Sequence, residues 1–285
     1  MKPETFASRT FIESMLKLTR FGNLVIIALS QYFTAGFLIG MDTLNDPTLF
    51  LLSISTIAIA AGGYIINDYY DVKIDYINKP DRVVIGKNIT RRYAILFHVM
   101  LSAFGIVVGA YLSWRIGAVN VVSVFLLWLY SNSLKRLPFI GNLTVAFLTG
   151  LSVYLVELFY RSGNSLVAIY ALFAFFMTLI REVIKDMEDL KGDNSFGCKT
   201  LPIIWGIRKT KILLYVILII FAGVVIMMNQ LYRALPFKYH LVFLFVPLLW
   251  LLYRLIRADM KKDFTRLSIF CKVIMMLGIL SMAFM

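Results

Sequence analysis

Long apolar stretches alternate with short polar segments along the whole chain. All but one of the stretches are long enough to cross the hydrocarbon core of a bilayer, which takes about 20 residues of helix, and each holds at most one charged residue. The pattern predicts nine membrane-spanning helices, over residues 21–41, 48–66, 93–114, 116–134, 137–156, 165–180, 212–231, 235–253 and 267–285. The sixth is short, and we expect the polar residues after it to extend it.

The predicted segments should be helical because lipid offers backbone N–H and C=O groups no hydrogen-bond partner. Composition agrees, since 60% of the 285 residues are hydrophobic and the mean hydropathy is +0.80, too apolar for an ordinary soluble domain. No Ser/Gly-rich linker divides the chain. We therefore expect one all-α, polytopic membrane domain over residues 1–285, with its nine helices around a central cavity.

Positive charge is distributed unevenly across the predicted membrane. The formal net charge is +13, and 24 of the 29 Lys and Arg residues fall on the side of the N-terminus and of the loops after helices two, four, six and eight. Four fall on the opposite side, and Lys272 lies within the last predicted helix. Lys and Arg accumulate on the cytoplasmic side of membrane proteins, so we expect a cytoplasmic N-terminus in the cell membrane. Topology and anionic lipids account for the basicity, and we expect no nucleic-acid partner.

The first of two acidic clusters follows the second predicted helix. It contains Asn67, Asp68, Asp71 and Asp75. Steps of three and four residues place the three aspartates on one helical face, which Asn67 adjoins.

The second acidic cluster follows the sixth predicted helix. Glu182, Asp186, Asp189 and Asp193 are separated by steps of four, three and four residues. This spacing again gives one stripe, if the helix continues that far. Glu188 falls off the stripe, so we expect it to be solvated.

Stacked carboxylates at the end of an apolar helix need a compensating partner. Like charges at helical spacing repel one another, and one acid near the bilayer centre costs at least about 2.5–3.5 kcal/mol. Oxygen ligands without His or Cys favour a hard cation such as Mg2+, which prefers a few carboxylates together with waters and substrate phosphates. Two such stripes on one predicted side indicate a magnesium-bridged diphosphate at the cytoplasmic face.

Two other interpretations are compatible with these residues. The acids can be solvated helix ends at the level of the lipid headgroups. They can also mark the ion path of a proton- or sodium-coupled transporter. Transport sites usually lie near the bilayer midplane, whereas these acids gather at one end of their helices.

The polar segments also resemble the signatures of a known family. Residues 67–82, with Asn-Asp-x-x-Asp-x-x-x-Asp and then Ile-Asn-Lys-Pro-Asp-Arg, are similar to the first signature of the UbiA superfamily of membrane prenyltransferases. Residues 185–202, with Lys-Asp-x-x-Asp-x-x-Gly-Asp and then Phe-Gly-x-Lys-Thr-Leu-Pro, resemble the second. Residues 130–136 and 141–143 resemble the stretch around the family's fourth and fifth helices. The resemblance covers nearly the whole chain.

The resemblance implies a nine-helix enzyme that transfers a prenyl group from an isoprenoid diphosphate to a lipid-soluble acceptor, with Mg2+ as cofactor. The second signature, from Arg181 onward, looks most like that of digeranylgeranylglyceryl phosphate synthases, which join a geranylgeranyl chain to a glycerol-phosphate ether lipid. Relatives that prenylate an aromatic quinone precursor, of the 4-hydroxybenzoate or dihydroxynaphthoate type, share much of the first signature and are the alternative. Membrane lipids are expected partners, and an obligate protein partner is not.

One short segment departs from the family pattern. Residues 83–86 read Val-Val-Ile-Gly, where many relatives carry a Pro-x-Pro-Ser-Gly turn. We therefore expect a differently shaped loop after the first signature.

The acidic stripes and the resemblance together imply roles for individual residues. Two magnesium ions are expected to bind Asn67, Asp68 and Asp71 on one side and Asp186, Asp189 and Asp193 on the other. The acids expected to be catalytic are Asp71, Asp75, Asp189 and Asp193. The cations expected to contact the diphosphate are Lys73, Arg82, Lys135, Lys185 and Lys199. The residues expected to line the acceptor or prenyl pocket are Arg20, Asn23, Tyr130 and Glu182.

Overall fold

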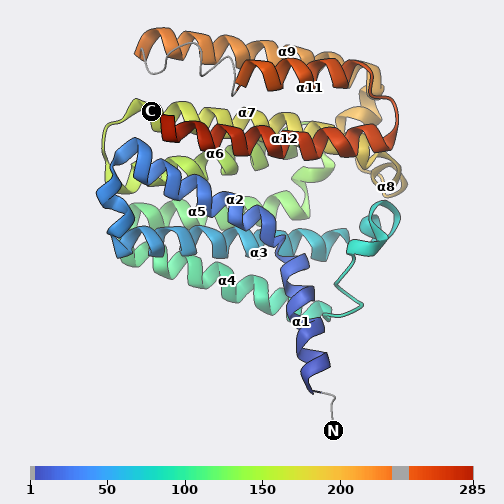
Figure 1. Cartoon of the computed structure of the whole chain (residues 1–285). Coiled ribbons are helices and arrows are strands. Elements are labelled where there is room, and N and C mark those ends of the chain that lie inside the picture. The colour runs from blue at the N-terminus through green and yellow to red at the C-terminus, as the bar shows by residue number, and fades with distance from the viewer. Residues whose placement is uncertain (1–3, 233–243, 285) are drawn as a thin grey trace. The chain divides into compact units, whose positions relative to one another are not determined.

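The computed structural model describes residues 4–232 and 244–284. Every regular element in these ranges is helical, and their one β pairing is an isolated bridge between Ile85 and Ile89 (Figure 1). The expected all-α class is therefore confirmed. The chain forms two compact units, residues 1–28 with 47–134 and residues 29–46 with 135–285. The single domain and the central cavity stay predictions.

Eight helices in the described ranges are long and apolar enough to cross a membrane. They are Phe21–Ile39, Pro47–Asn78, Arg91–Leu112, Trp114–Asn132, Ile140–Tyr160, Ser165–Glu188, Leu201–Met228 and Lys261–Phe284. The predicted run 235–253 overlaps residues 233–243, which lie outside the described ranges, and a shorter apolar helix, α11 (Val246–Ile256), occupies its end. The chain is an integral membrane protein, while the count of nine and the side of the N-terminus stay predictions.

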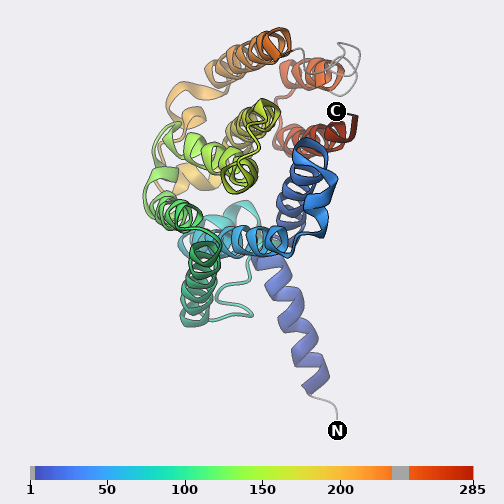
Figure 2. The same ribbon diagram turned by 90° about the vertical axis from the view of Figure 1, so that its left-hand side faces the viewer.

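The first span joins two kinds of helix. α2 (Phe21–Phe33) continues as the π-helix η1 (Thr34–Ile39) and is followed by the 3-10 helix η2 (Met41–Asn45). Before it, α1 (Glu4–Leu18), which the apolar pattern did not predict, projects away from the other helices of its unit in both views (Figures 1 and 2).

The remaining helices are α3 (Pro47–Asn78), α4 (Arg91–Leu112), α5 (Trp114–Asn132), α6 (Ile140–Tyr160), α7 (Ser165–Glu188), α8 (Leu190–Ser195), α9 (Leu201–Tyr232) and α12 (Lys261–Ser281). Short 3-10 helices are η3 (Pro80–Arg82), η4 (Leu134–Arg136) and η6 (Met282–Phe284).

Two spans run well beyond their apolar cores. α3 continues past residue 66 to Asn78, and α7 continues past residue 180 to Glu188. The expected extension of the sixth span is thus confirmed. The acidic residues of the first cluster, and those of the second up to Glu188, lie on regular helix rather than in loops.

Small residues allow α3, α4 and α5 to pack closely in the first unit. A Cβ on Gly105 of α4 would lie 2.6 Å from Ile59 Cγ1 and 2.8 Å from Ser55 O, both on α3. Asn120 of α5 donates to Ser55 Oγ at 2.8 Å and to Gly105 O at 2.9 Å. Small residues and buried interhelical hydrogen bonds of this kind hold membrane helices together. This three-helix interface supports the helix that carries the first acidic cluster.

The loop between α3 and α4 folds back onto α1. Val84 and Ile85 are buried in an apolar cluster with Leu18 of α1. Gly86 adopts a φ of 87°, a conformation that glycine tolerates without cost. Asn88 donates to Ser14 Oγ of α1 at 2.8 Å. The segment that departs from the family's proline-containing turn is a tight turn held by burial.

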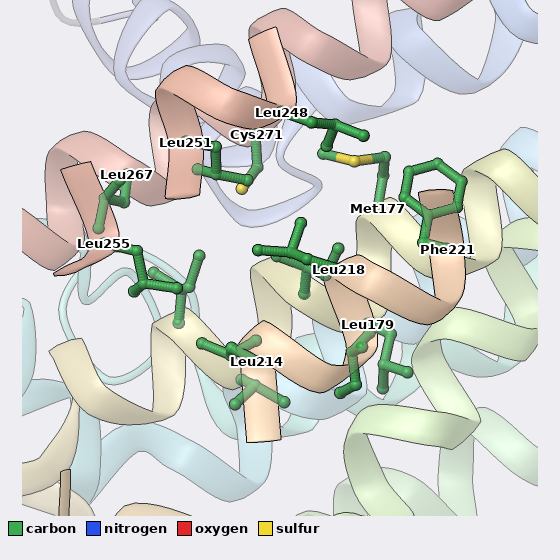
Figure 3. Close-up of a cluster of buried hydrophobic side chains, with 14 of the residues drawn as sticks. Met177, Leu179, Leu214, Leu218, Phe221, Leu248, Leu251, Leu255, Leu267 and Cys271 are labelled. Carbon is green, nitrogen blue, oxygen red and sulfur yellow. The ribbon is translucent and has the colours of Figure 1, made fainter. Parts of the chain in front are cut away.

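α7 packs against α6, α9 and α12 in the second unit, and much of this core is aliphatic. The labelled side chains of Figure 3 come from four helices and meet around α9. They are Met177, Leu179, Leu214, Leu218, Phe221, Leu248, Leu251, Leu255, Leu267 and Cys271. This core fixes the C-terminal half of α7, where the second acidic cluster begins.

We expect Gly105→Ala to destabilise the protein. The added methyl group meets the backbone oxygen of Ser55, which cannot move without shifting α3, and overpacking of this kind costs about 1–3 kcal/mol. The measurement is the thermal unfolding midpoint in detergent. Gly223→Ala is the matched control, because nothing lies within 4 Å of an added Cβ there and alanine favours helix over glycine. Equal midpoints for the two variants would contradict the packing argument.

Candidate functional site

The first acidic cluster lies on the last three turns of α3. Asn67, Asp68, Asp71 and Asp75 all fall within this helix, so the predicted shared face is confirmed for the aspartates. Asp68 Oδ1 lies 2.7 Å from Arg20 Nη2, with 18% of the Asp68 side chain and 34% of the Arg20 side chain exposed. One of the predicted metal ligands therefore already has a cation beside it.

Arg20 stands at the junction between α1 and α2 and has a φ of 52°. Its guanidinium lies 4.9 Å from the centroid of the Tyr64 ring of α3, and Asn23 donates to the Tyr64 hydroxyl at 3.2 Å. Burial acts to lower the pKa of Arg20, but the Asp68 carboxylate raises it above its ordinary value. Of the two residues expected at the acceptor pocket, Arg20 thus reaches the acidic end of α3 and Asn23 reaches Tyr64, one turn before it.

Asn67 offers an oxygen that no described residue uses. Its Oδ1 is enclosed, and within the described ranges it accepts no hydrogen bond. An orphaned buried oxygen costs free energy unless a partner arrives, and amide oxygen is a ligand suited to a hard cation. No three acidic, His or Cys groups of the described residues gather closely enough to hold a metal by themselves. Mg2+ takes few protein ligands and completes its shell with waters and phosphates.

The second acidic cluster is bent at its middle. α7 ends at Glu188, Asp189 has non-helical angles of φ −93° and ψ 5°, and α8 carries Asp193. The Asp193 N–H still donates to Asp189 O at 3.2 Å. The expected single helical stripe is therefore interrupted at Asp189, although the chain resumes a helical turn at once.

Asp186 has a partner that the sequence did not assign. Asn142 of α6 is buried and donates to Asp186 Oδ2 at 2.9 Å. Asn142 lies in the stretch that resembles the family's sequence around its fourth and fifth helices, but a single amide in an apolar helix gave no indication of its partner. A hydrogen bond of this kind orients a carboxylate for a metal or a substrate.

Glu182 is buried and lies between two cations of its own helix. Its carboxylate contacts Arg181 Nη1 at 2.5 Å and Lys185 Nζ at 3.2 Å. Lys185 was expected to contact the diphosphate, and Glu182 was expected near the acceptor or prenyl pocket. The structure joins these two residues through one ion pair.

The expectation that Glu188 is solvated is wrong. Its residue exposure is 9%, and Ser268 of α12 donates to its Oε2 at 3.3 Å. Helical spacing placed Glu188 off the acidic stripe, but it did not reveal that α12 covers this side of α7. The carboxylate faces a packed helix instead of water.

The other expected contact residues lie on several elements. Lys73 of α3, Arg82 of η3 and Lys199 between α8 and α9 are exposed, whereas Lys135 of η4 is partly buried. The Lys199 N–H donates to Arg136 O at 2.8 Å, which brings the segment after α8 beside η4. Tyr130, near the end of α5, is partly buried. Their roles stay predictions.

Comparisons with known proteins point to one family. The model of the UbiA prenyltransferase family matches residues 28–276. The digeranylgeranylglyceryl phosphate synthase of Methanosphaera stadtmanae is 35% identical over 79% of this chain and 83% of that protein. The synthase of the same name from Sulfurisphaera tokodaii is 32% identical over 88% and 90%. A solved UbiA homologue from Archaeoglobus fulgidus, bound to GPP and Mg2+, shares the fold with a TM-score of 0.74 at 16% identity, covering 95% of this chain and 99% of that one.

We expect Arg20 and Asp68 to be energetically coupled. Because both side chains are partly exposed, the coupling in an Arg20→Gln and Asp68→Asn double-mutant cycle should be about 1 kcal/mol. It should shrink at high salt, which screens the pair. Thermal unfolding in detergent measures it, with Arg92→Gln as the control because Arg92 is an exposed cation of the same unit. Strictly additive effects would mean that the pair contributes nothing.

Proposed function

The chain belongs to the UbiA prenyltransferase family, and we propose that it transfers a geranylgeranyl group from its diphosphate to geranylgeranylglyceryl phosphate in ether-lipid synthesis. The observation that carries this proposal is the match to synthases of that name over most of both chains. The two acidic clusters at the ends of α3 and α7 support it, because both clusters contain the ligand types that a metal diphosphate needs.

Mg2+ is the proposed cofactor, and the donor set fits it. The first site would use Asn67, Asp68 and Asp71, and the orphaned Asn67 oxygen supports this assignment. The second would use Asp186, Asp189 and Asp193. Carboxylate and amide oxygens suit a hard cation. When bound, Mg2+ supplies positive charge to the diphosphate as it departs.

The proposed reaction is an alkylation of a hydroxyl group. A bond forms between the acceptor hydroxyl oxygen and the first carbon of the prenyl chain, and the bond from that carbon to the diphosphate oxygen breaks. The diphosphate leaves with the electron pair, and the hydroxyl proton is released. Negative charge grows on the leaving group, so cations fixed beside it lower the barrier.

Basic side chains complete the proposed diphosphate site. The cations that we assign to the diphosphate are Lys73, Arg82, Lys135, Lys185 and Lys199. Arg82 suits a bidentate grip, whereas a lysine acts as a point charge. Asp75, one turn beyond Asp71, would orient the first ligand set, and Tyr130 would line the prenyl groove. We place the proposed diphosphate site at the cytoplasmic face of the cell membrane, because the basic loops favour that side.

The function is tested with membranes that contain the protein and labelled geranylgeranyl diphosphate. Geranylgeranylglyceryl phosphate, 4-hydroxybenzoate and dihydroxynaphthoate are offered in turn, and the product is identified by chromatography and mass spectrometry. We expect an ether product from the first acceptor only, its loss on chelation with EDTA, and its return with Mg2+. Alkylation of an aromatic acid instead would assign the protein to quinone synthesis. Turnover that survives EDTA would refute the requirement for Mg2+.

Asp189→Asn should lower turnover by a factor of at least about 100, because a carboxylate that holds the metal beside developing charge contributes several kcal/mol. The initial rate at saturating substrates and Mg2+ measures the effect, and expression and the unfolding midpoint should stay near those of the wild type. Asp42→Asn is the control, since Asp42 is an exposed acid of η2. Full activity of the Asp189 variant at saturating Mg2+ would remove Asp189 from the metal site.

A further inference from the structure

Three charged side chains crowd one turn near the end of the membrane-spanning helix α7. The Glu182 carboxylate holds Arg181 with one oxygen and Lys185 with the other. The exposed fractions of the three side chains are only 16% for Arg181, 10% for Glu182 and 22% for Lys185. Two cations share one acid, so this group carries one positive charge in excess.

The Arg181 guanidinium has more N–H donors than its contact with Glu182 uses. A guanidinium carries five N–H groups in a fixed fork, and the Glu182 contact engages Nη1. The Nε atom is enclosed and donates to no residue in the described ranges. A buried donor of a charged group is costly when it stays unsatisfied. The Arg181 side chain is largely shielded from water, which strengthens the attraction of the guanidinium for an anion.

The position of Arg181 separates it from the proposed diphosphate site. Arg181 precedes Asp186 by five residues, so it lies roughly 7 Å further from the C-terminal end of α7 along the helix axis. An anion bound by Arg181 therefore lies deeper in the membrane than one bound at Asp186.

The chemistry of the reaction indicates which anion Arg181 would bind. The attacked carbon is attached to the diphosphate and lies on its membrane side, where the prenyl chain continues. The acceptor hydroxyl must reach that carbon, so the acceptor's headgroup lies at the depth of the reacting carbon. In a glycerol phosphate the hydroxyl and the phosphate are only a few bonds apart.

We propose that Arg181 binds the phosphate of the acceptor lipid and thereby selects a phosphate-bearing acceptor over a neutral or aromatic one. This inference rests on the proposed function. A planar guanidinium grips a phosphate with two parallel hydrogen bonds. Glu182 is the positioning residue, because it ties Arg181 to Lys185 on the diphosphate side and so sets the spacing of the two anionic groups.

The test is the Arg181→Gln variant in the same membrane assay, with each substrate titrated at saturation of the other. We expect the KM for geranylgeranylglyceryl phosphate to rise at least about tenfold, as for the loss of a charged hydrogen bond. The KM for geranylgeranyl diphosphate should change less than twofold. Arg208→Gln is the matched control, since Arg208 is an exposed arginine of α9 in the same unit, and both KM values should stay at the wild-type level.

Two further variants keep the result interpretable. If Arg181→Gln fails to fold because Glu182 loses a partner, the double variant Arg181→Gln, Glu182→Gln removes the charged pair together. Its KM for the acceptor should exceed that of Glu182→Gln alone, while its KM for geranylgeranyl diphosphate should equal that of Glu182→Gln. Glu182→Gln alone should raise both KM values, because it releases both cations, whereas a purely structural role would lower the unfolding midpoint and leave the KM values unchanged.

Three outcomes would overturn the inference. An unchanged acceptor KM in the folded Arg181 variant refutes the contact. A rise in the KM for the prenyl diphosphate alone assigns Arg181 to the diphosphate instead. A wild-type protein that ignores the phosphate acceptor refutes the proposed function as well, and that result is visible before any variant is made.

Discussion

Charged side chains in this protein need a partner, because they stand at the ends of helices made for lipid. A carboxylate in a medium poor in water is costly unless it is paired or hydrogen-bonded. Four of the buried or half-buried acids described above have such a partner. The pairs are Asp68 with Arg20, Glu182 with Arg181 and Lys185, Asp186 with Asn142, and Glu188 with Ser268.

These partners also shape what the acids can do. Asn142 and Ser268 are neutral donors, so they orient Asp186 and Glu188 without cancelling their negative charge. Arg20 cancels much of the charge of Asp68, and a metal ion at that site would have to share or displace the guanidinium. The first cluster is therefore partly neutralised before any ligand arrives, whereas the hydrogen-bond partner of Asp186 adds no positive charge.

The sequence predicted the spans and the acidic faces because both depend on local spacing. Apolar length identified eight described membrane helices, and steps of three and four residues placed Asp68, Asp71 and Asp75 on one face of α3. It did not predict α1, since a short helix of mixed polarity gives no membrane signal. It missed the Asn142 contact and misjudged Glu188, because α6 and α12 supply those neighbours from distant parts of the chain. The roles of the site residues depend on ligands and stay predictions.

The turn after the first signature is ordered by burial, whereas a proline-containing turn is ordered by its own backbone. Prolines limit the conformations of the unfolded chain, so a proline-containing turn carries its own rigidity wherever it is placed. Here Val84 and Ile85 obtain order by burial beside Leu18, which makes the loop's order conditional on the helix that precedes the first span. The N-terminal helix thus holds the loop that follows Arg82 in place, and loosening that helix would disorder a loop whose own sequence is intact.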